Sequence, residues 1–423
     1  MNKDGAIKDI ERRLGYTLKG KQYEAVRAIR SGKDTFVIAG PGFGKSGIFH
    51  TAGLLEESKL TIVVEPTISL IVDQVRHLSA LEQPASIACM TSHNTDEHKN
   101  ILQKVKNGEI TFLFVTPERL QQDSFRKAVS KHEPWLLAID ECHLIMDWGT
   151  SFRRDYLKIG GFMESLSSRP VVLAMTATAP QTYRGEIKSN LLMEQPKEII
   201  TSIDKPNLSI IVEDATTHKQ KGRKEHLIYM LKRVQKNIKH HGTKQDGSLD
   251  STIVYCLTPD DVEVVANFLR PYYEDCVTVS HGKLSKKARA ENEMQFLTGE
   301  KPIIVASSAF GQGVDKADIR LIIHLGLPLS PVDYYQQIGR GGRDGGKAKA
   351  VVIYDKGWMK KNAALIQEAP KGSRTRMQKA QKRLEAILKG DMCIMTELLK
   401  ELGENREKPC NHCTVCQKRR RKK

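Results

Sequence analysis

Ala39-Gly40-Pro41-Gly42-Phe43-Gly44-Lys45-Ser46 is a glycine-rich stretch that ends in Gly-Lys-Ser. It follows the apolar run Thr35-Phe36-Val37-Ile38, which predicts a buried parallel strand, and it precedes a segment that can begin a helix. In this setting Gly42 and Gly44 let backbone N–H groups surround phosphates, Lys45 reaches the β- and γ-phosphates, and the Ser46 hydroxyl coordinates Mg²⁺. An ordinary glycine-rich turn is the alternative, because Ala39 stands where the strict pattern has a glycine. The stretch predicts a phosphate-binding loop.

Length and charge limit the class of protein. A chain of 423 residues is too long for one core, so we expect two domains and something smaller. Lys and Arg number 67 against 50 Asp and Glu, and a net charge of +17 favours nucleic acid as partner. No apolar run approaches the roughly 18 residues that cross a bilayer, and the N-terminus lacks a signal peptide's apolar region. We expect an intracellular protein without membrane contact, in the nucleus of a eukaryote or the cytoplasm or nucleoid of a prokaryote.

Short apolar runs alternate with longer amphipathic stretches in two blocks. The expected strands are residues 35–38, 61–64, 111–115, 136–139 and 171–175, and then 252–255, 303–306, 321–323 and 351–354. Strands that alternate with helices form parallel sheets covered on both faces. The pattern weakens over residues 201–222, and residues 239–251 suggest a loop. The sequence therefore predicts an α/β fold with two such domains in series and a cleft between them.

The C-terminal part differs in composition. Beyond Gly357 a basic helical stretch carries Arg374, Arg376, Lys379, Lys382 and Arg383, which suits either a solvated helix face or a nucleic-acid contact. Residues 418–423 are all basic, and we expect them to be a disordered tail.

The cysteines fall into two groups. Cys89, Cys142, Cys256 and Cys276 are scattered, and all of these except Cys142 lie in short apolar stretches typical of buried thiols. Four others cluster near the C-terminus: Cys393, Cys410, Cys413 and Cys416. Without a secretory signal, such clustering favours a metal site over disulfides. Four thiolates suit a structural Zn²⁺ site, although the tight Cys-x2-Cys-x2-Cys run is also compatible with an iron–sulfur cluster.

Asp140 and Glu141 come directly after the expected strand 136–139, at the strand end where ligands of open α/β sheets bind. Asp140 can hold Mg²⁺, and Glu141 can polarise the water that attacks the γ-phosphate. An acidic helix cap is the alternative. With a Gly-Lys-Ser loop upstream, the pair favours phosphoryl transfer.

Two arginines three residues apart, Arg340 and Arg343, lie among glycines in the segment Gln336-Gln337-Ile338-Gly339-Arg340-Gly341-Gly342-Arg343-Asp344. Guanidinium groups suit phosphate oxygens, so arginines of the second domain can act on a γ-phosphate bound by the first. A basic turn is the alternative.

Taken in order, these motifs resemble superfamily 2 helicases, and more narrowly the RecQ family. The segments that carry the resemblance are Gln22, the Gly-Lys-Ser loop, residues 65–75, 115–120, Asp140-Glu141-Cys142-His143, residues 176–179, 309–316 and 339–345. Trp148-Gly149-x-x-Phe152-Arg153 resembles the family's aromatic-rich loop, and the cysteine cluster resembles its zinc-binding subdomain. The resemblance runs from about Leu14 to Cys416.

The resemblance implies two tandem RecA-like parallel-sheet domains and a small helical zinc-binding subdomain. We expect the ATP-binding domain over residues 1–205, the second helicase domain over 206–357, the zinc-binding subdomain over 358–417 and the basic tail over 418–423. The family also favours zinc over an iron–sulfur cluster. We expect chelation, or replacement of Cys413 by Ser, to destabilise this module.

The resemblance also assigns roles to single residues. Gln22 would recognise the adenine, with Lys19 beside it and Asp315 at the nucleotide, and Lys45 and Ser46 would bind phosphates and metal. Gln336, Arg340 and Arg343 would face the γ-phosphate, with Arg343 as the arginine finger. His143, Thr176 and Thr178 would link the ATP site to the DNA face. Trp148, Phe152 and Arg153 would couple DNA contact to hydrolysis, since base stacking on aromatic rings does not depend on sequence.

Four departures from the family pattern limit what can be transferred. Cys142 stands where the family has Ala, Lys19 where an adenine-side Arg is usual, and Thr150 where the aromatic-rich loop has His. An ammonium cannot reproduce the planar fork of a guanidinium. We also expect no winged-helix or C-terminal helical domain, which leaves unwinding strength and preferred DNA structure open.

The sequence thus predicts an ATP- and Mg²⁺-dependent, Zn²⁺-containing 3′–5′ DNA helicase, acting on single-stranded and partially duplex DNA in repair and recombination. We expect a monomer. The rivals are an RNA-directed or duplex-translocating motor of the same superfamily and a non-catalytic DNA-binding or strand-annealing protein. Lys45, Asp140, Glu141 and Arg343 argue against the non-catalytic rival, because binding alone does not need them.

Overall fold

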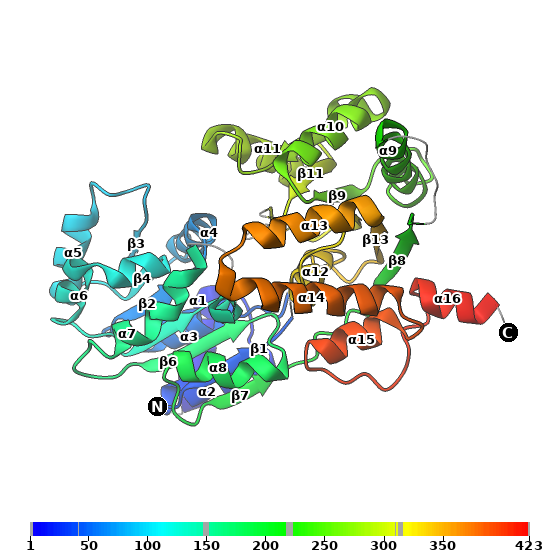
Figure 1. Ribbon diagram of the computed structural model, residues 1–423. Coiled ribbons are helices and arrows are strands. Elements are labelled where there is room, and N and C mark those ends of the chain that lie inside the picture. Colours follow the sequence, from blue (N-terminus) through cyan, green and yellow to red (C-terminus); the bar gives the residue numbers. More distant parts are fainter. Residues whose placement is uncertain are drawn as a thin grey trace. The chain divides into compact units, whose positions relative to one another are not determined.

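The computed structural model describes residues 3–40, 42–146, 152–216, 223–308, 310–311 and 316–421. The chain divides into two compact units, Met1–Ile203 and Asp204–Lys423, and each contains its own sheet (Figure 1). Within the described residues, no helix is both long and apolar enough to span a bilayer.

The first unit is built on a seven-stranded parallel sheet in the order β3-β4-β2-β5-β6-β1-β7. Its strands are β1 (Thr35–Ile38), β2 (Thr61–Val64), β3 (Ile87–Met90), β4 (Phe112–Val115), β5 (Leu136–Ile139), β6 (Val171–Thr176) and β7 (Lys197–Ile200). Its α-helices are α1 (Lys3–Leu14), α2 (Gly20–Arg30), α3 (Ser46–Leu55), α4 (Ile68–Ser79), α5 (His98–Lys106), α6 (Asp123–Val129), α7 (Ile159–Met163) and α8 (Gln181–Asn190). Short 3-10 helices cover Pro117–Gln121, Cys142–Met146 and Phe152–Lys158.

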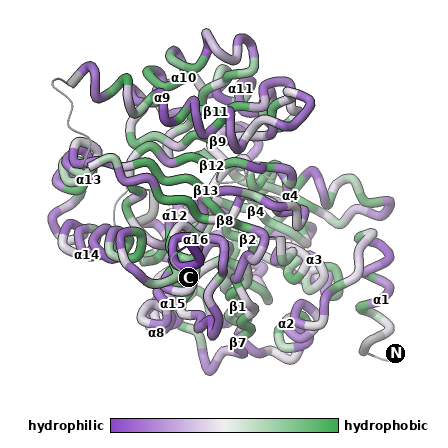
Figure 2. Tube along the Cα trace, turned by 90° about the vertical axis from the view of Figure 1, so that its right-hand side faces the viewer, coloured by the Kyte–Doolittle hydropathy of each residue, from purple (hydrophilic) through white to green (hydrophobic). Residues whose placement is uncertain are grey.

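Both faces of this sheet are buried. Neighbouring residues of one strand enter different apolar clusters: Phe36 and Ile38 belong to one, and Val37 belongs to the other. Because successive side chains of a strand point to opposite faces, the two clusters are the two sides of the sheet. This explains why the central strands are continuous apolar runs, green in Figure 2.

The second unit contains a six-stranded parallel sheet in the order β10-β11-β9-β12-β13-β8. Its strands are β8 (Leu208–Asp214), β9 (Ser251–Cys256), β10 (Val277–Ser280), β11 (Ile303–Ser307), β12 (Ile319–Leu325) and β13 (Ala348–Tyr354). Its helices are α9 (Arg223–His241), α10 (Pro259–Tyr273), the 3-10 helix Glu274–Cys276, α11 (Lys286–Thr298), α12 (Pro331–Ile338), α13 (Lys356–Glu368), α14 (Lys371–Lys389), α15 (Ile394–Glu401) and α16 (Thr414–Arg421). The prediction of two parallel-sheet α/β domains is confirmed.

The strands missing from the prediction are β3, β7, β8 and β10, and these are the two outer strands of each sheet. An outer strand has a neighbour on one side only and often exposes one face, so its sequence mixes polar and apolar residues. In β7 only Ile199 is buried, and in β8 buried and half-buried residues alternate at first. The outer strand β10 (Val277–Ser280) is fully buried, but Thr278 and Ser280 interrupt its apolar residues. A search for continuous apolar runs therefore misses β7 and β10, whereas β3 (Ile87–Met90) is an apolar run that the prediction passed over.

Three smaller expectations are wrong. Residues 418–421 are helical, because α16 begins in the cysteine cluster and basic side chains are favourable in a helix's last turn. The expected loop at 239–251 begins later, since α9 extends to His241, and its far end belongs to β9. Cys256 is buried as expected, but Cys89 and Cys276 are only half-buried, because each lies on or beside an outer strand.

Candidate nucleotide site, arginine loop and cysteine centre

The glycine-rich loop leads from β1 into α3, as the sequence predicts. Gly42 and Gly44 both have positive φ, +79° and +80°, which glycine adopts without strain. A β-carbon at Gly44 would also lie 2.8 Å from Nε2 of Gln22. The loop therefore needs glycine at this position for two reasons, and it places the N-terminus of a ten-residue helix at the site.

Gln22 holds the loop from the side. Its Nε2 donates to the carbonyl oxygens of Phe43 (2.9 Å) and Gly44 (2.7 Å), and its Oε1 accepts from the backbone N–H of Lys19 (2.6 Å). The Lys19 ammonium lies 3.5 Å from the carbonyl oxygen of Gly42. These two predicted adenine-side residues thus lie at the loop.

Lys45 and Ser46, the predicted phosphate and metal ligands, are held in place by neighbouring groups. The Lys45 ammonium donates to the carbonyl oxygen of Ala39 at 3.1 Å. Nε2 of Gln74, on α4, donates to the Ser46 hydroxyl at 3.1 Å. A hydroxyl that accepts this bond keeps a second lone pair free for a cation, so Gln74 orients a potential metal ligand.

Asp140 and Glu141 follow β5 at the carboxyl end of the sheet, where the sequence places them. Burial, and next the negative charge of Glu141, raise the pKa of Asp140 to about 6. One Asp140 oxygen accepts from the backbone N–H of Glu141 (2.8 Å), and the Tyr156 hydroxyl donates to the Asp140 carbonyl oxygen (3.1 Å). Glu141 has φ +48°, a left-handed conformation that costs a non-glycine residue roughly 1 kcal/mol. Strain of this kind is concentrated at functional sites.

A chain of polar contacts connects Glu141 to the end of β6. Nδ1 of His143 lies 3.1 Å from Glu141 Oε2 and 2.9 Å from the Thr176 hydroxyl. That hydroxyl donates to the carbonyl oxygen of Thr178 (3.0 Å), so it accepts from His143, whose proton is then on Nδ1. The three predicted coupling residues His143, Thr176 and Thr178 therefore form one buried chain that begins at Glu141.

In the second unit, Gln336 lies on α12 and the two arginines lie on the loop that follows. Lys205 donates to the carbonyl oxygens of Gly339 (2.5 Å) and Gly341 (2.9 Å). Asn207 donates to those of Gly342 (2.8 Å) and Gly346 (2.7 Å). Burial, and next the charge of Arg343, lower the pKa of Lys205 to about 8. The loop, 339–346, is thus held from the segment just before β8, and we call it the arginine loop.

Further contacts hold the ends of the arginine loop. Arg320, on β12, makes two hydrogen bonds to Asp344, of 2.9 and 2.5 Å. The Arg340 guanidinium packs so closely on Gly311 that a side chain there would overlap with it. The loop is a fixed turn in the described structure.

Four predicted site residues lie wholly or partly outside the described residues. Asp315 and Trp148 lie outside the described residues. Phe152 and Arg153 belong to the 3-10 helix Phe152–Lys158, but their side chains lie outside the described part.

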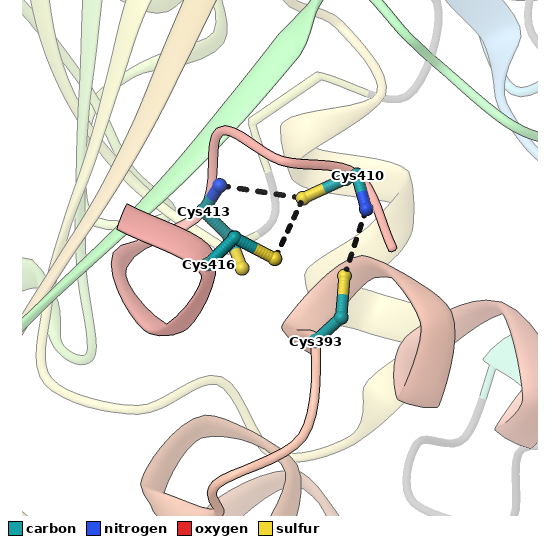
Figure 3. Close-up of side chains that lie close together, drawn as sticks. All are labelled: Cys393, Cys410, Cys413 and Cys416. Carbon is teal, nitrogen blue, oxygen red and sulfur yellow. Dashed lines mark hydrogen bonds between the residues drawn. The ribbon is translucent and has the colours of Figure 1, made fainter. Parts of the chain in front are cut away.

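Four cysteine side chains come together at the C-terminus, as Figure 3 shows. All four are buried, and their sulfur atoms lie within 4.8 Å of one another. In a tetrahedral ZnS₄ site the sulfurs are about 3.8 Å apart, and Cys410 and Cys416 are 4.0 Å apart. The backbone N–H groups of Cys410 and Cys413 donate to Cys393 and Cys410 sulfurs (3.1 and 3.3 Å), which favours thiolates. The residues therefore fit a structural Zn²⁺ ion.

The cysteine centre is attached to the sheet of its own unit. The Thr414 hydroxyl accepts from the backbone N–H of Val212 (2.8 Å), on the outer strand β8. Nδ1 of His412 lies 3.4 Å from the hydroxyl of Ser209 on the same strand. A metal in this centre would thus fix a segment that covers the edge of β8.

Several residues at these sites were given no role by the sequence. Gln74 lies in a segment that carries the family resemblance, but nothing in the sequence shows which of its residues face the loop. Tyr156, Lys205 and Asn207 lie in no motif, and they act through hydrogen bonds to the backbone of other segments. Only the tertiary structure reveals such partners.

A phosphate-binding loop with a carboxylate pair on one parallel sheet, and an arginine loop on a second, define the core of a superfamily 2 helicase. Two family models match the chain: DEAD/DEAH box helicase over residues 19–185 and the helicase conserved C-terminal domain over residues 231–345. The chain belongs to the RecQ family. It is 30% identical to a probable ATP-dependent DNA helicase, RecS, of Bacillus subtilis over 355 residues, covering 84% of this chain and 68% of that protein.

A second relative is longer than the chain. The ATP-dependent DNA helicase RecQ of Haemophilus influenzae is 30% identical over 423 residues, which cover 98% of this chain and 64% of that protein. The chain spans less than two thirds of the length of this relative.

Two solved structures have a fold similar to that of this chain. Mss116p bound to ssRNA and AMP-PNP superposes with a TM-score of 0.65 at 16% identity, covering 95% of this chain and 88% of that one. The DNA-bound helicase MrfA gives the same TM-score at 17% identity, over 84% of this chain and 52% of that one. The RecA-like character of both units is therefore shown.

Proposed function

We propose that this protein is an ATP- and Mg²⁺-dependent 3′–5′ DNA helicase of RecQ type, which couples ATP hydrolysis to movement along single-stranded DNA and to duplex unwinding. The observation that carries the proposal is the first unit's site. There the phosphate-binding loop, the Asp140–Glu141 pair and the chain from Glu141 to Thr178 lie at the ends of strands of one sheet. A site for ATP binding alone does not need the buried contact from Glu141 to β6.

Each group of this site has a distinct chemical task. Lys45 neutralises β- and γ-phosphate charge, and the helix N-terminus of α3 adds backbone N–H donors. Ser46 and Asp140 would hold Mg²⁺, which supplies charge stabilisation when bound. Glu141 orients the attacking water, and its contact with His143 lets a change at Thr176 alter the position of that carboxylate. A shift in the groups around the γ-phosphate can thereby be transmitted to the residues at the end of β6.

The roles of the second unit belong to the proposal too. We place the ATP-binding domain at residues 1–205, the second helicase domain at 206–357, the zinc-binding subdomain at 358–417 and a basic C-terminal segment at 418–423. Gln336, Arg340 and Arg343 act on the γ-phosphate, and Arg343 is the finger. Asp315 contacts the nucleotide, and Trp148, Phe152 and Arg153 contact DNA. The net charge of +17 and the names of the relatives support DNA as partner.

A strand-displacement assay tests the proposal. Duplexes with a 3′ tail, a 5′ tail or a fork are incubated with the protein, with and without ATP and Mg²⁺. We expect displacement from the 3′-tailed and forked duplexes with ATP only. Annealing or binding without ATP turnover would instead support the non-catalytic rival.

An RNA-directed motor is the second candidate. A putative ATP-dependent RNA helicase, R290 of Acanthamoeba polyphaga mimivirus, is also 30% identical, over 346 residues. Stimulation of ATP hydrolysis by single-stranded DNA, duplex DNA and RNA separates the two candidates. We expect single-stranded DNA to stimulate most, and stronger stimulation by RNA would favour the second.

A further inference from the structure

Glu65 is a buried carboxylate beside the nucleotide site that has no role so far. It comes directly after β2, its exposed fraction is 0%, and both carboxylate oxygens are shielded from solvent. Neither oxygen has a hydrogen-bond partner among the residues that the structure describes. Burying an ionised carboxylate without a partner costs several kcal/mol of folding free energy. A purely structural role in the core therefore does not explain Glu65.

The sheet register points Glu65 toward the site. β2 and β5 pair in parallel with Val64 opposite Ile139, and the backbone N–H of Asp140 donates to the Val64 carbonyl oxygen at 3.0 Å. Glu65 is therefore the next residue opposite Asp140. Side chains that are opposite in neighbouring strands lie on the same face of a sheet. Glu65 and Asp140 thus stand side by side at the carboxyl ends of their strands.

The charges around Glu65 agree with this placement. After burial, the groups that raise the Glu65 pKa are Asp140 and Glu141, and the group that lowers it is Lys45. These are the predicted metal ligand, the predicted water-polarising group and the predicted phosphate ligand. Glu65 therefore interacts with three groups of the nucleotide site, although the sequence assigned it no role.

We propose that Glu65 is a second carboxylate of the Mg²⁺ site, which holds the cation together with Ser46 and Asp140, directly or through a bound water. The inference rests on the proposed function, because the cation arrives with the nucleotide. A divalent cation binds oxygen ligands, and the buried carboxylates of Glu65 and Asp140 stand side by side here. Oxygen ligands are the ones that Mg²⁺ prefers, and carboxylates often hold it through its waters.

The test is calorimetric titration of the purified full chain with ADP, in Mg²⁺ and in EDTA. The wild-type protein should bind ADP more tightly in Mg²⁺. Glu65→Gln keeps the shape and removes the charge, and it should reduce this Mg²⁺-dependent gain about tenfold while leaving affinity in EDTA unchanged. Glu65→Asp keeps the charge and should retain part of the gain.

The matched control is Glu198→Gln, which removes one carboxylate from β7 of the same unit, with three strands between β7 and β2. It should behave as the wild-type protein. Affinity in EDTA and the thermal melt report folding, and Glu65→Ser takes the place of Glu65→Gln if that variant does not fold. A Mg²⁺-dependent gain within twofold of wild type in a folded neutral variant overturns the inference and leaves the proposed function standing. Failure of the wild-type protein to bind ADP overturns both.

Discussion

The two units contain the same kind of parallel sheet but place their functional groups in different ways. In the first unit the carboxylates follow strands directly, as Asp140 follows β5 and Glu65 follows β2. In the second the arginines lie on a loop after α12, and Lys205 and Asn207 hold that loop through its carbonyl oxygens. A group at a strand end is held in position by the sheet itself. A group on a loop depends on distant residues that hydrogen-bond its backbone.

Replacement of Lys45 by Ala tests the first arrangement and should have the largest effect. Both ground-state binding and transition-state charge stabilisation are lost, so kcat/KM for ATP should fall about 10⁴-fold. DNA-stimulated phosphate release measures the loss. Salt-sensitive DNA binding should remain, and Lys127→Ala, an exposed lysine on α6, should behave as the wild type. Turnover that survives in Lys45→Ala would refute the mechanism.

Replacement of Arg343 by Ala tests the second arrangement. A finger acts mainly on the transition state, so kcat should fall about 10³-fold while ATP affinity changes less than about threefold. Single-turnover hydrolysis with equilibrium binding of a fluorescent ATP analogue separates the two quantities. Arg270→Ala, an exposed arginine on α10, is the control. An equal loss of affinity and turnover would make Arg343 a ground-state ligand instead.

Removal of one cysteine from the metal centre should destabilise the second unit. Cys413→Ser removes a thiolate and a metal that fixes the segment at β8, and we expect a loss of roughly 3 kcal/mol in the free energy of unfolding. Chemical denaturation and zinc content by mass spectrometry measure this. Cys276→Ser, which removes a cysteine of the same unit outside the cluster, should change neither. Normal stability in zinc-free protein would contradict a structural metal.

Replacement of Asn207 by Ala should have the smallest effect and sharpens the comparison most. Two carbonyl oxygens of the arginine loop lose their donor, which costs about 1 to 3 kcal/mol of stability. If the loop positions Arg343, kcat should fall several-fold with ATP affinity unchanged, a split that general destabilisation would not produce. Asn267→Ala, on the exposed side of α10, is the control.

The sequence predicts the buried centre of this protein far better than its edges. Five central strands of the first unit and four of the second were predicted within three residues at either end, because strands buried on both faces are continuous apolar runs. Each of the four outer strands was missed: β7 buries one residue of four, β10 alternates Val with Thr and Ser, and β3 is an apolar run that the prediction passed over. The position of Asp140 follows from the same rule, because it is the first residue after a central strand.

The amino-acid sequence by itself determined two parallel-sheet α/β units, the phosphate-binding loop, the carboxylates after β5 and the clustering of four cysteines. Those features depend on local order along the chain: apolar runs, glycine spacing and the residue that follows a strand. Only the tertiary structure decided that Glu65 lies buried beside Asp140, that His143 joins Glu141 to Thr176, and that Asn207 holds the arginine loop. These three contacts depend on strand order and on packing between segments far apart in the sequence. Neither can be predicted from the local pattern of residues.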